Sequence, residues 1–171
     1  MKYWSKLVLR LVFGLLFVLV YGVFYEVLRV LTIYPSYFLI NLGYSVGLVG
    51  NSLFFGGNVV NFIPACIAAV AYALLLFLII FTKGIGFGKS VKMFVLGSLL
   101  ILIMNVIRID LLLVILFEFG PDMFDNVHLV FWNFISGIYV AFVWIFLVKK
   151  FKVSGIPIVS DVRYLYKRIN S

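Results

Sequence analysis

Long runs of apolar residues dominate the chain, and four of them are long enough to cross a bilayer. A helix needs about 20 mostly apolar residues to span the hydrocarbon core. The expected spans are residues 7–33, 64–82, 91–117 and 128–148. A turn or charge signal follows each of them, at Pro35, Lys83-Gly84, Gly120-Pro121 and Lys149-Lys150. This pattern predicts an all-α fold, a multi-pass transmembrane helix bundle of about four spans that forms one domain over residues 1–148.

Two further segments are apolar or amphipathic but too short to span. Residues 36–50 are apolar in character but number only 15, which predicts a short interfacial or re-entrant helix. In the basic tail, residues 149–171, apolar side chains recur with helical spacing at Val162, Leu165, Tyr166 and Ile169. A short helix on the anionic lipids of the inner leaflet fits this spacing, and a partly disordered soluble tail fits it as well.

Composition supports a membrane protein and excludes several classes of site. Hydrophobic residues make up 65% of the chain and charged residues 12%, whereas soluble domains are about 45–50% apolar and about 25% charged. The single cysteine, Cys66, excludes an internal disulfide and a multi-cysteine metal site. With one histidine, His128, a zinc site would consist almost wholly of carboxylates. We therefore expect no metal and no cofactor.

The positions of Lys and Arg predict the orientation in the cell membrane. Twelve of the 14 basic residues lie at the N-terminus, between the second and third spans, or after the fourth span. The connections 34–63 and 118–127 contain none. Because cytoplasmic loops carry the excess of basic residues, we expect both termini to be cytoplasmic. The net charge of +8 is then explained by topology, and we expect no nucleic-acid partner because the chain has no basic groove interleaved with aromatic residues.

Four ionisable residues fall within the expected spans, and such residues are costly enough to be functional candidates. They are Glu26, Arg29, Arg108 and Asp110. Asn105 precedes Arg108 by three residues, so the two share a helix face that must meet protein or water. Glu26 and Arg29 also share a face. They either pair with each other or join a network with Arg108 and Asp110.

The expected depths of three side chains place them in the same layer of the membrane: Cys66, Arg108 and His128. Arg108 lies roughly 13 Å along its helix from the outer end of the third span, at residue 117. Cys66 falls in the first turn of the second span, and His128 begins the fourth. We therefore expect helix packing to bring the three together near the outer face.

These three side chains together have the chemistry of acyl transfer through a thioester. Pro64 suits the first helical position and would place Cys66 among free N–H groups, where a thiolate is stabilised. Histidine can accept and return a proton near neutral pH, and arginine can stabilise an oxyanion. Each residue also has a plainer interpretation: a packed cysteine, an interfacial histidine, and an arginine in a structural ion pair with Glu26.

The order and spacing of these residues resemble the exosortase/archaeosortase family. The resemblance is carried by three short segments: Pro64-Ala65-Cys66-Ile67-Ala68, Asn105-Val106-Ile107-Arg108-Ile109 and Asn126-Val127-His128. It covers roughly residues 60–140 and implies a multi-pass enzyme with Cys66, Arg108 and His128 as an outward-facing active site. The implied substrates are secreted proteins with a C-terminal tail made of a short signature, a transmembrane helix and a basic cluster. The tail is removed and the protein is passed to an acceptor.

The chain departs from that family at two points. Members commonly have Cys-Ser-Gly at the nucleophile, where this chain has Cys66-Ile67-Ala68. Many members also have more than four spans, so this chain looks like a minimal form. In this interpretation Asn105 orients Arg108 or the substrate, Glu26 and Arg29 support the site, and residues 51–63 and 118–127 frame its entrance. Gly56-Gly57 would let an extended substrate pass close to the backbone.

Two other functions also fit the polar residues. In a small substrate-binding or transport subunit, Arg108 and Arg29 would bind an anion and Glu26 would balance the charge. In an aspartyl signal peptidase, Asp110 and Asp125 would share a proton and activate water. Asp110 lies about 200° around the helix from Arg108, and the other motifs of that peptidase family are not found.

Overall fold

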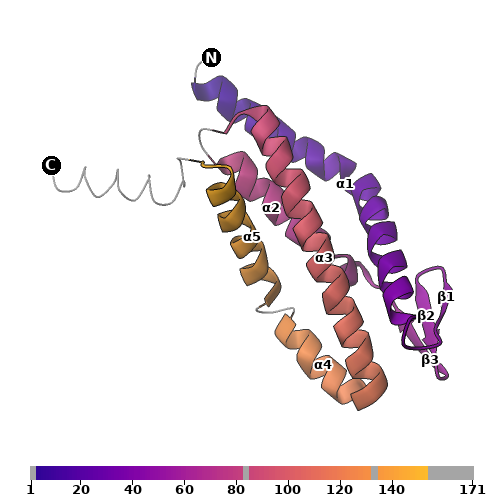
Figure 1. Ribbon diagram of the computed structural model, residues 1–171. Coiled ribbons are helices and arrows are strands. Elements are labelled where there is room, and N and C mark those ends of the chain that lie inside the picture. The colour runs from indigo at the N-terminus through magenta and orange to yellow at the C-terminus, as the bar shows by residue number, and fades with distance from the viewer. Residues whose placement is uncertain (1–2, 83–84, 132–134, 154–171) are drawn as a thin grey trace.

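The computed structural model describes residues 3–82, 85–131 and 135–153, and this part of the chain is mostly helical (Figure 1). The α-helices are α1 (Tyr3–Ile40), α2 (Ala69–Phe81), α3 (Phe87–Phe119), α4 (Pro121–Val130) and α5 (Ser136–Lys150). A short 3-10 helix, η1 (Pro64–Ile67), precedes α2. The expectation of a mainly helical protein is confirmed. Lys83 and the tail helix expected at 162–169 lie outside the described residues.

Helix α3 is the central element of the fold. It has 33 residues. Among the helices in the described part of the chain, it is the one that is long enough and apolar enough to cross a membrane. It includes the expected span 91–117. Helix α2 is shorter than the expected span 64–82, because the first residues of that range form η1 and α2 itself has 13 residues. Helix α1 includes the expected span 7–33 and continues beyond it.

A three-stranded antiparallel sheet corrects the all-α prediction and the prediction of a helix at 36–50. Helix α1 runs through Pro35 to Ile40, and the chain then enters β1 (Gly47–Val49), β2 (Ser52–Phe55) and β3 (Asn58–Asn61) in the order β1-β2-β3. Glycines at the turns explain the hairpins. Gly50 has φ +60, and Gly56 and Gly57 have φ +54 and +83, the positive values that tight hairpin turns need.

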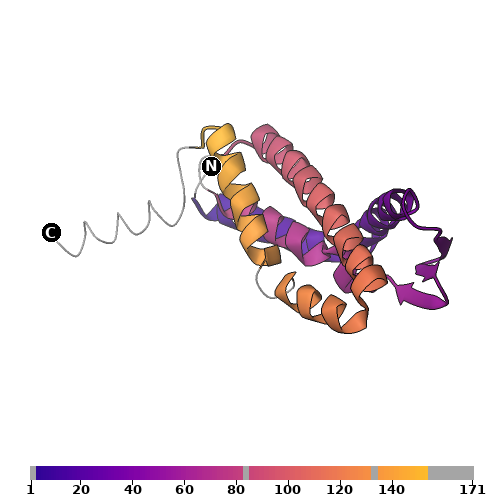
Figure 2. The ribbon, with the colours of Figure 1, turned by 60° about the horizontal axis from the view of Figure 1, so that its bottom comes forward.

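In the region of the expected span 128–148, α4 ends at Val130 and α5 begins at Ser136, and residues 132–134 between them lie outside the described part of the chain. His128 lies near the end of α4. Gly120, with φ +82, reverses the chain after α3, so that α4 folds back against α3 (Figure 2). The ten residues of α4 include Asp122, Asp125 and Asn126, which makes this helix too short and too polar to cross a bilayer.

Helices α2, α3 and α5 pack closely around one glycine. A Cβ atom on Gly97 of α3 would lie 2.6 Å from Cδ2 of Leu75 on α2 and 2.8 Å from Cδ1 of Leu147 on α5. Both leucines are fully buried. A small residue at this position therefore lets the three helices approach one another, as small residues do in helical membrane proteins.

The two ends of this bundle differ in charge. At one end Lys89 Nζ donates a hydrogen bond to the Phe151 carbonyl at 3.2 Å, close to Lys149 and Lys150 at the end of α5. At the other end Glu118 accepts a hydrogen bond of 2.7 Å from Tyr44 Oη, and α4 adds two aspartates. In Figure 1 the end of α5 and the start of α3 lie together, opposite α4 and the sheet.

The junction between η1 and α2 is strained, and this generates a stability prediction. Ala68 has φ +55, in the left-handed region that costs a non-glycine residue roughly 1–2 kcal/mol. We expect Ala68→Gly to stabilise the fold by up to about 1 kcal/mol, since the gain exceeds the entropy cost of glycine. Ala73→Gly, inside α2, should instead destabilise it by about 0.5–1 kcal/mol. Thermal unfolding in detergent measures both, and a loss of stability in Ala68→Gly would contradict the strain.

Candidate functional site

Cys66 lies on η1, where the chain passes from the sheet into α2. Pro64 begins this turn, as expected, and the Cys66 thiol is half-buried. The Cys66 backbone N–H donates to the Ile63 carbonyl at 2.9 Å. The expectation that this N–H would be free is therefore wrong, because η1 has the i to i+3 bonding of a 3-10 helix.

Asn105 connects α3 to the cysteine. Its Nδ2 donates a hydrogen bond of 2.8 Å to the Cys66 carbonyl oxygen, and Asn105 is only 4% exposed. A buried carbonyl at the end of η1 needs such a partner. Asn105 therefore fixes the position of the cysteine backbone relative to α3, in addition to sharing a helix face with Arg108.

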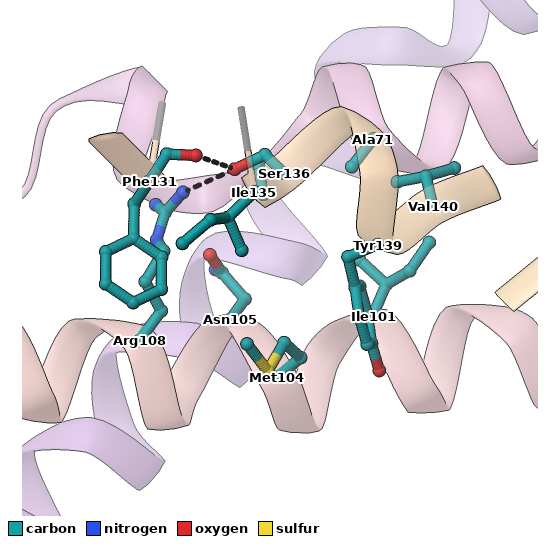
Figure 3. A pocket seen from close by; sticks show the side chains of 11 residues that line it. Ala71, Ile101, Met104, Asn105, Arg108, Phe131, Ile135, Ser136, Tyr139 and Val140 are labelled. Atoms are coloured by element: carbon teal, nitrogen blue, oxygen red, sulfur yellow. Dashed lines mark hydrogen bonds between the residues drawn. The ribbon is translucent and has the colours of Figure 1, made fainter. Parts of the chain in front are cut away.

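Arg108 is a buried cation between three elements. It is 6% exposed, and its Nη1 donates to Ser136 Oγ at 3.3 Å. Ser136 Oγ in turn donates to the Phe131 carbonyl at 2.9 Å (Figure 3). The charge of Arg108 acts on both Cys66 and His128. The structure thus brings Arg108 within electrostatic range of the two other residues of the expected trio.

The Arg108 guanidinium has a hydrogen-bond donor that no described residue uses. Its Nε is buried and has no hydrogen-bond partner in the described part of the chain. Leaving a buried charged donor unpaired is costly, and such groups are typical of sites that bind a ligand or stabilise a charge. A negatively charged oxygen would satisfy this donor.

A pocket opens beside Arg108, between the start of α2, the middle of α3 and the start of α5. Its walls are mostly apolar and include Ala71, Ile101, Met104 and Val140. Asn105, Arg108 and Ser136 supply polar groups at one end (Figure 3). Ala68, two residues after Cys66, lines the same pocket. The cleft is small, about 30 Å³, so only a water molecule or one small polar group could enter it, and neither Cys66 nor His128 is among its lining residues.

His128 lies in the last turn of α4 and is partly exposed. Burial lowers the pKa of His128, and the nearby charge of Arg108 lowers this pKa further, while Asp125 raises it. The Phe124 ring lies 5.4 Å from the His128 ring, centroid to centroid. At neutral pH His128 is therefore neutral and able to accept a proton.

Glu26 and Arg29 lie outside this cluster, which corrects the expected network with Arg108 and Asp110. They pair with each other at 2.7 Å, and Arg29 Nη1 also donates to the Asn51 side chain at the turn between β1 and β2. The pair is partly exposed, so it attaches α1 to the sheet.

Asp110 faces α1 rather than the site. It lies beside Ser36, whereas Asp125 is exposed on α4 and acts on His128. Within the described residues no contact joins the two carboxylates, which gives no support to an aspartyl dyad.

Ser136 is the site residue that sequence reasoning missed. It stands in the middle of an apolar run that was expected to be one span, and in the structure it is the first residue of α5. Because its hydroxyl accepts from Arg108 and donates to Phe131, it positions the guanidinium.

The electrostatic coupling between Arg108 and His128 is directly measurable because the chain has one histidine. We expect the NMR titration of His128 to have a midpoint below the usual value of about 6.5. Arg108→Gln should raise this midpoint, since a neighbouring cation is lost. Asp125→Asn should lower it, since a neighbouring anion is lost. A midpoint that does not move in Arg108→Gln would contradict the proximity of the two residues.

Comparison with protein-family models, with curated proteins and with solved structures finds no match to this chain.

Proposed function

We propose that this chain is a membrane-embedded cysteine protease or transpeptidase. It cleaves the C-terminal sorting signals of secreted proteins at the outer face of the cell membrane, through a thioester on Cys66. The observation that carries this proposal is the buried Arg108, whose charge acts on both the only cysteine and the only histidine. A cation between a thiol and an imidazole is suited to stabilising the anions of acyl transfer.

The reaction follows from these three side chains. His128, neutral at pH 7, accepts the proton of the Cys66 thiol, and the sulfur attacks the carbonyl carbon of the scissile peptide bond. The carbonyl π electrons move to oxygen, and Arg108 stabilises the resulting oxyanion, with its unpaired Nε as the donor. The C–N bond then breaks, protonated His128 gives its proton to the leaving amine, and the acyl group remains as a thioester on Cys66.

Release of the product uses the same base in the second half of the reaction. Water, or the amine or hydroxyl of a lipid or other acceptor, attacks the thioester carbonyl while His128 takes its proton. The C–S bond breaks, and the thiolate leaving Cys66 is reprotonated by His128. The accessible acceptor determines whether the enzyme hydrolyses or transfers, and this chemistry requires no cofactor.

The membrane setting that we propose has four spans, formed by α1, by η1 together with α2, by α3 and by α5, with both termini in the cytoplasm. The separation of a basic end from an acidic end supports this orientation, since basic residues favour the cytoplasmic side. The site lies toward the acidic end, where Arg108 donates to Ser136 and its charge acts on His128. Anionic lipids of the inner leaflet would then contact the basic tail.

The conformation of Ala68 gives independent support to the resemblance. In the Cys-Ser-Gly pattern of exosortases and archaeosortases, the glycine corresponds to Ala68, whose φ is +55. Glycine is the residue that adopts this conformation without strain. The backbone at Ala68 therefore has a conformation that favours the glycine of the family pattern, although this chain has alanine there.

An anion-binding subunit is the second candidate, and the unpaired Nε of Arg108 is the observation in its favour. A carboxylate or phosphate seated in the pocket beside Arg108 would satisfy that donor. This function makes no use of the Cys66 thiol, so a change at sulfur separates the two candidates.

The experiment compares cells that carry the wild-type chain with cells that carry Cys66→Ala. We expect secreted proteins with a C-terminal helix and basic cluster to keep these tails in Cys66→Ala cells, because the nucleophile that attacks the scissile peptide bond is lost. Processing should fall by at least about 100-fold, as for loss of a nucleophile. Mass analysis of the C-termini measures it. Asp110→Asn, on the face of α3 toward α1, is the matched control and should process normally.

Undiminished processing in Cys66→Ala cells would end the protease proposal, and a loss in Asp110→Asn alone would favour the aspartyl mechanism.

A further inference from the structure

Strand β3 lies at an edge of the sheet and leads directly to the cysteine. The strand order β1-β2-β3 leaves one side of β3 unpaired. The chain leaves β3 at Asn61, and η1, which carries Cys66, begins three residues later at Pro64. In Figure 1 the sheet lies beside the lower end of α1, away from α4 and α5.

The register identifies which backbone groups are free. Phe62 N donates to the Asn51 carbonyl at 2.8 Å, and Leu53 pairs with Val60 two residues further along both strands. In an antiparallel pair, hydrogen-bonded and non-hydrogen-bonded positions alternate. Val60 and Phe62 therefore point their N–H and C=O groups toward β2, and Val59 and Asn61 point theirs outward.

The outward groups are accessible. Val59 is 53% exposed and Ile63 is 50% exposed, and Asn61 is also exposed. No hydrogen bond in the described part of the chain uses the outward backbone groups of Val59 and Asn61. An edge with free groups is a template for another extended chain.

We propose that β3 is the docking edge for the substrate: an extended segment of the secreted protein, just before its C-terminal helix, pairs with Val59 and Asn61 as a fourth strand. This inference rests on the proposed function. The order of elements along the chain indicates which partner would pair with β3. The path β3-η1-α2 runs from the sheet, past Cys66, into an apolar helix. A tailed substrate has the same order of extended segment, scissile bond and apolar helix.

The pairing is therefore parallel. A strand parallel to β3 presents the peptide bond that follows it at the level of η1, and its helix then enters the membrane beside α2. Main-chain pairing gives affinity with little demand on side chains. The Gly56-Gly57 turn, at the far end of β3, leaves the start of this edge open.

Proline variants at the two edges of the sheet test this inference. Val59→Pro removes the outward N–H of β3 without removing a bond to β2, because proline lacks only that donor. Leu48→Pro is the control on the opposite edge, since Val49 pairs with Ser52 and Gly47 with Phe54 across the turn, which points the Leu48 N–H away from the sheet. Leu48 is half-buried against the core while Val59 is exposed, so the control is the harsher substitution of the two. We expect Val59→Pro to reduce processing at least about tenfold and Leu48→Pro to leave it within about twofold.

A second readout covers the case in which Val59→Pro disturbs the fold. A photoreactive phenylalanine analogue is placed at position 59 or at position 49, both exposed, in the Cys66→Ala chain, in cells that retain tailed proteins. Cross-links from position 59 to the segment before the substrate's helix, and none from position 49, support the docking. Cross-links from position 59 to a second copy of this chain overturn it.

The two proposals fail in different ways. Normal processing in Val59→Pro cells, with processing lost in Cys66→Ala cells, overturns the docking edge and leaves the proposed function standing. Normal processing in Cys66→Ala cells overturns both.

Discussion

A single buried guanidinium connects the middle of α3 to the start of α5. An isolated charge in an apolar interior is costly unless it is paired and hydrogen-bonded. Arg108 donates to Ser136 Oγ, and Ser136 Oγ in turn donates to the carbonyl of Phe131, the residue that follows α4. The same cation therefore links α3 to the start of α5 and to the end of α4.

Asn105 extends the same constraint to the cysteine. One turn from Arg108, it is buried and donates to the Cys66 carbonyl. The polar face of α3 thus contacts η1 through Asn105 and the region of α4 and α5 through Arg108. The strained Ala68 lies two residues after Cys66, and strain of this kind is concentrated at functional sites. Packing around Gly97, about two turns of α3 before Asn105, brings α2 and α5 close to α3.

The sequence predicted the parts of the site that depend on helix periodicity and depth. Asn105 and Arg108 lie three residues apart, and this spacing alone implied a shared face. The grouping of Cys66, Arg108 and His128 was predicted from their depths, and in the structure the charge of Arg108 acts on each of the other two. The hairpins were missed because residues 36–50 and 51–63 are apolar, and strand and helix cannot be told apart by composition in short apolar runs. The glycines at 50, 56 and 57 were the available signal.

The remaining errors have a physical cause that one sequence does not reveal. The role of Ser136 depends on its hydrogen bond with Arg108, which is a tertiary contact between residues 28 positions apart. Glu26 and Arg29 satisfy each other locally, so their distance from Arg108 follows from the path of α1 and not from their residue types.

The central claim is that the Arg108 cation lies close enough to Cys66 to favour ionisation of its thiol, and the rate of Cys66 alkylation tests it most directly. The reagent is membrane-impermeant and added from outside at pH 7, and Cys66 is the only thiol. Arg108→Gln should slow the reaction at least about fivefold, since a neighbouring cation favours the thiolate. Arg29→Gln, which removes the same charge from the pair with Glu26, should change the rate less than about twofold. An alkylation rate that is equal in the wild-type and Arg108→Gln proteins would contradict the claim.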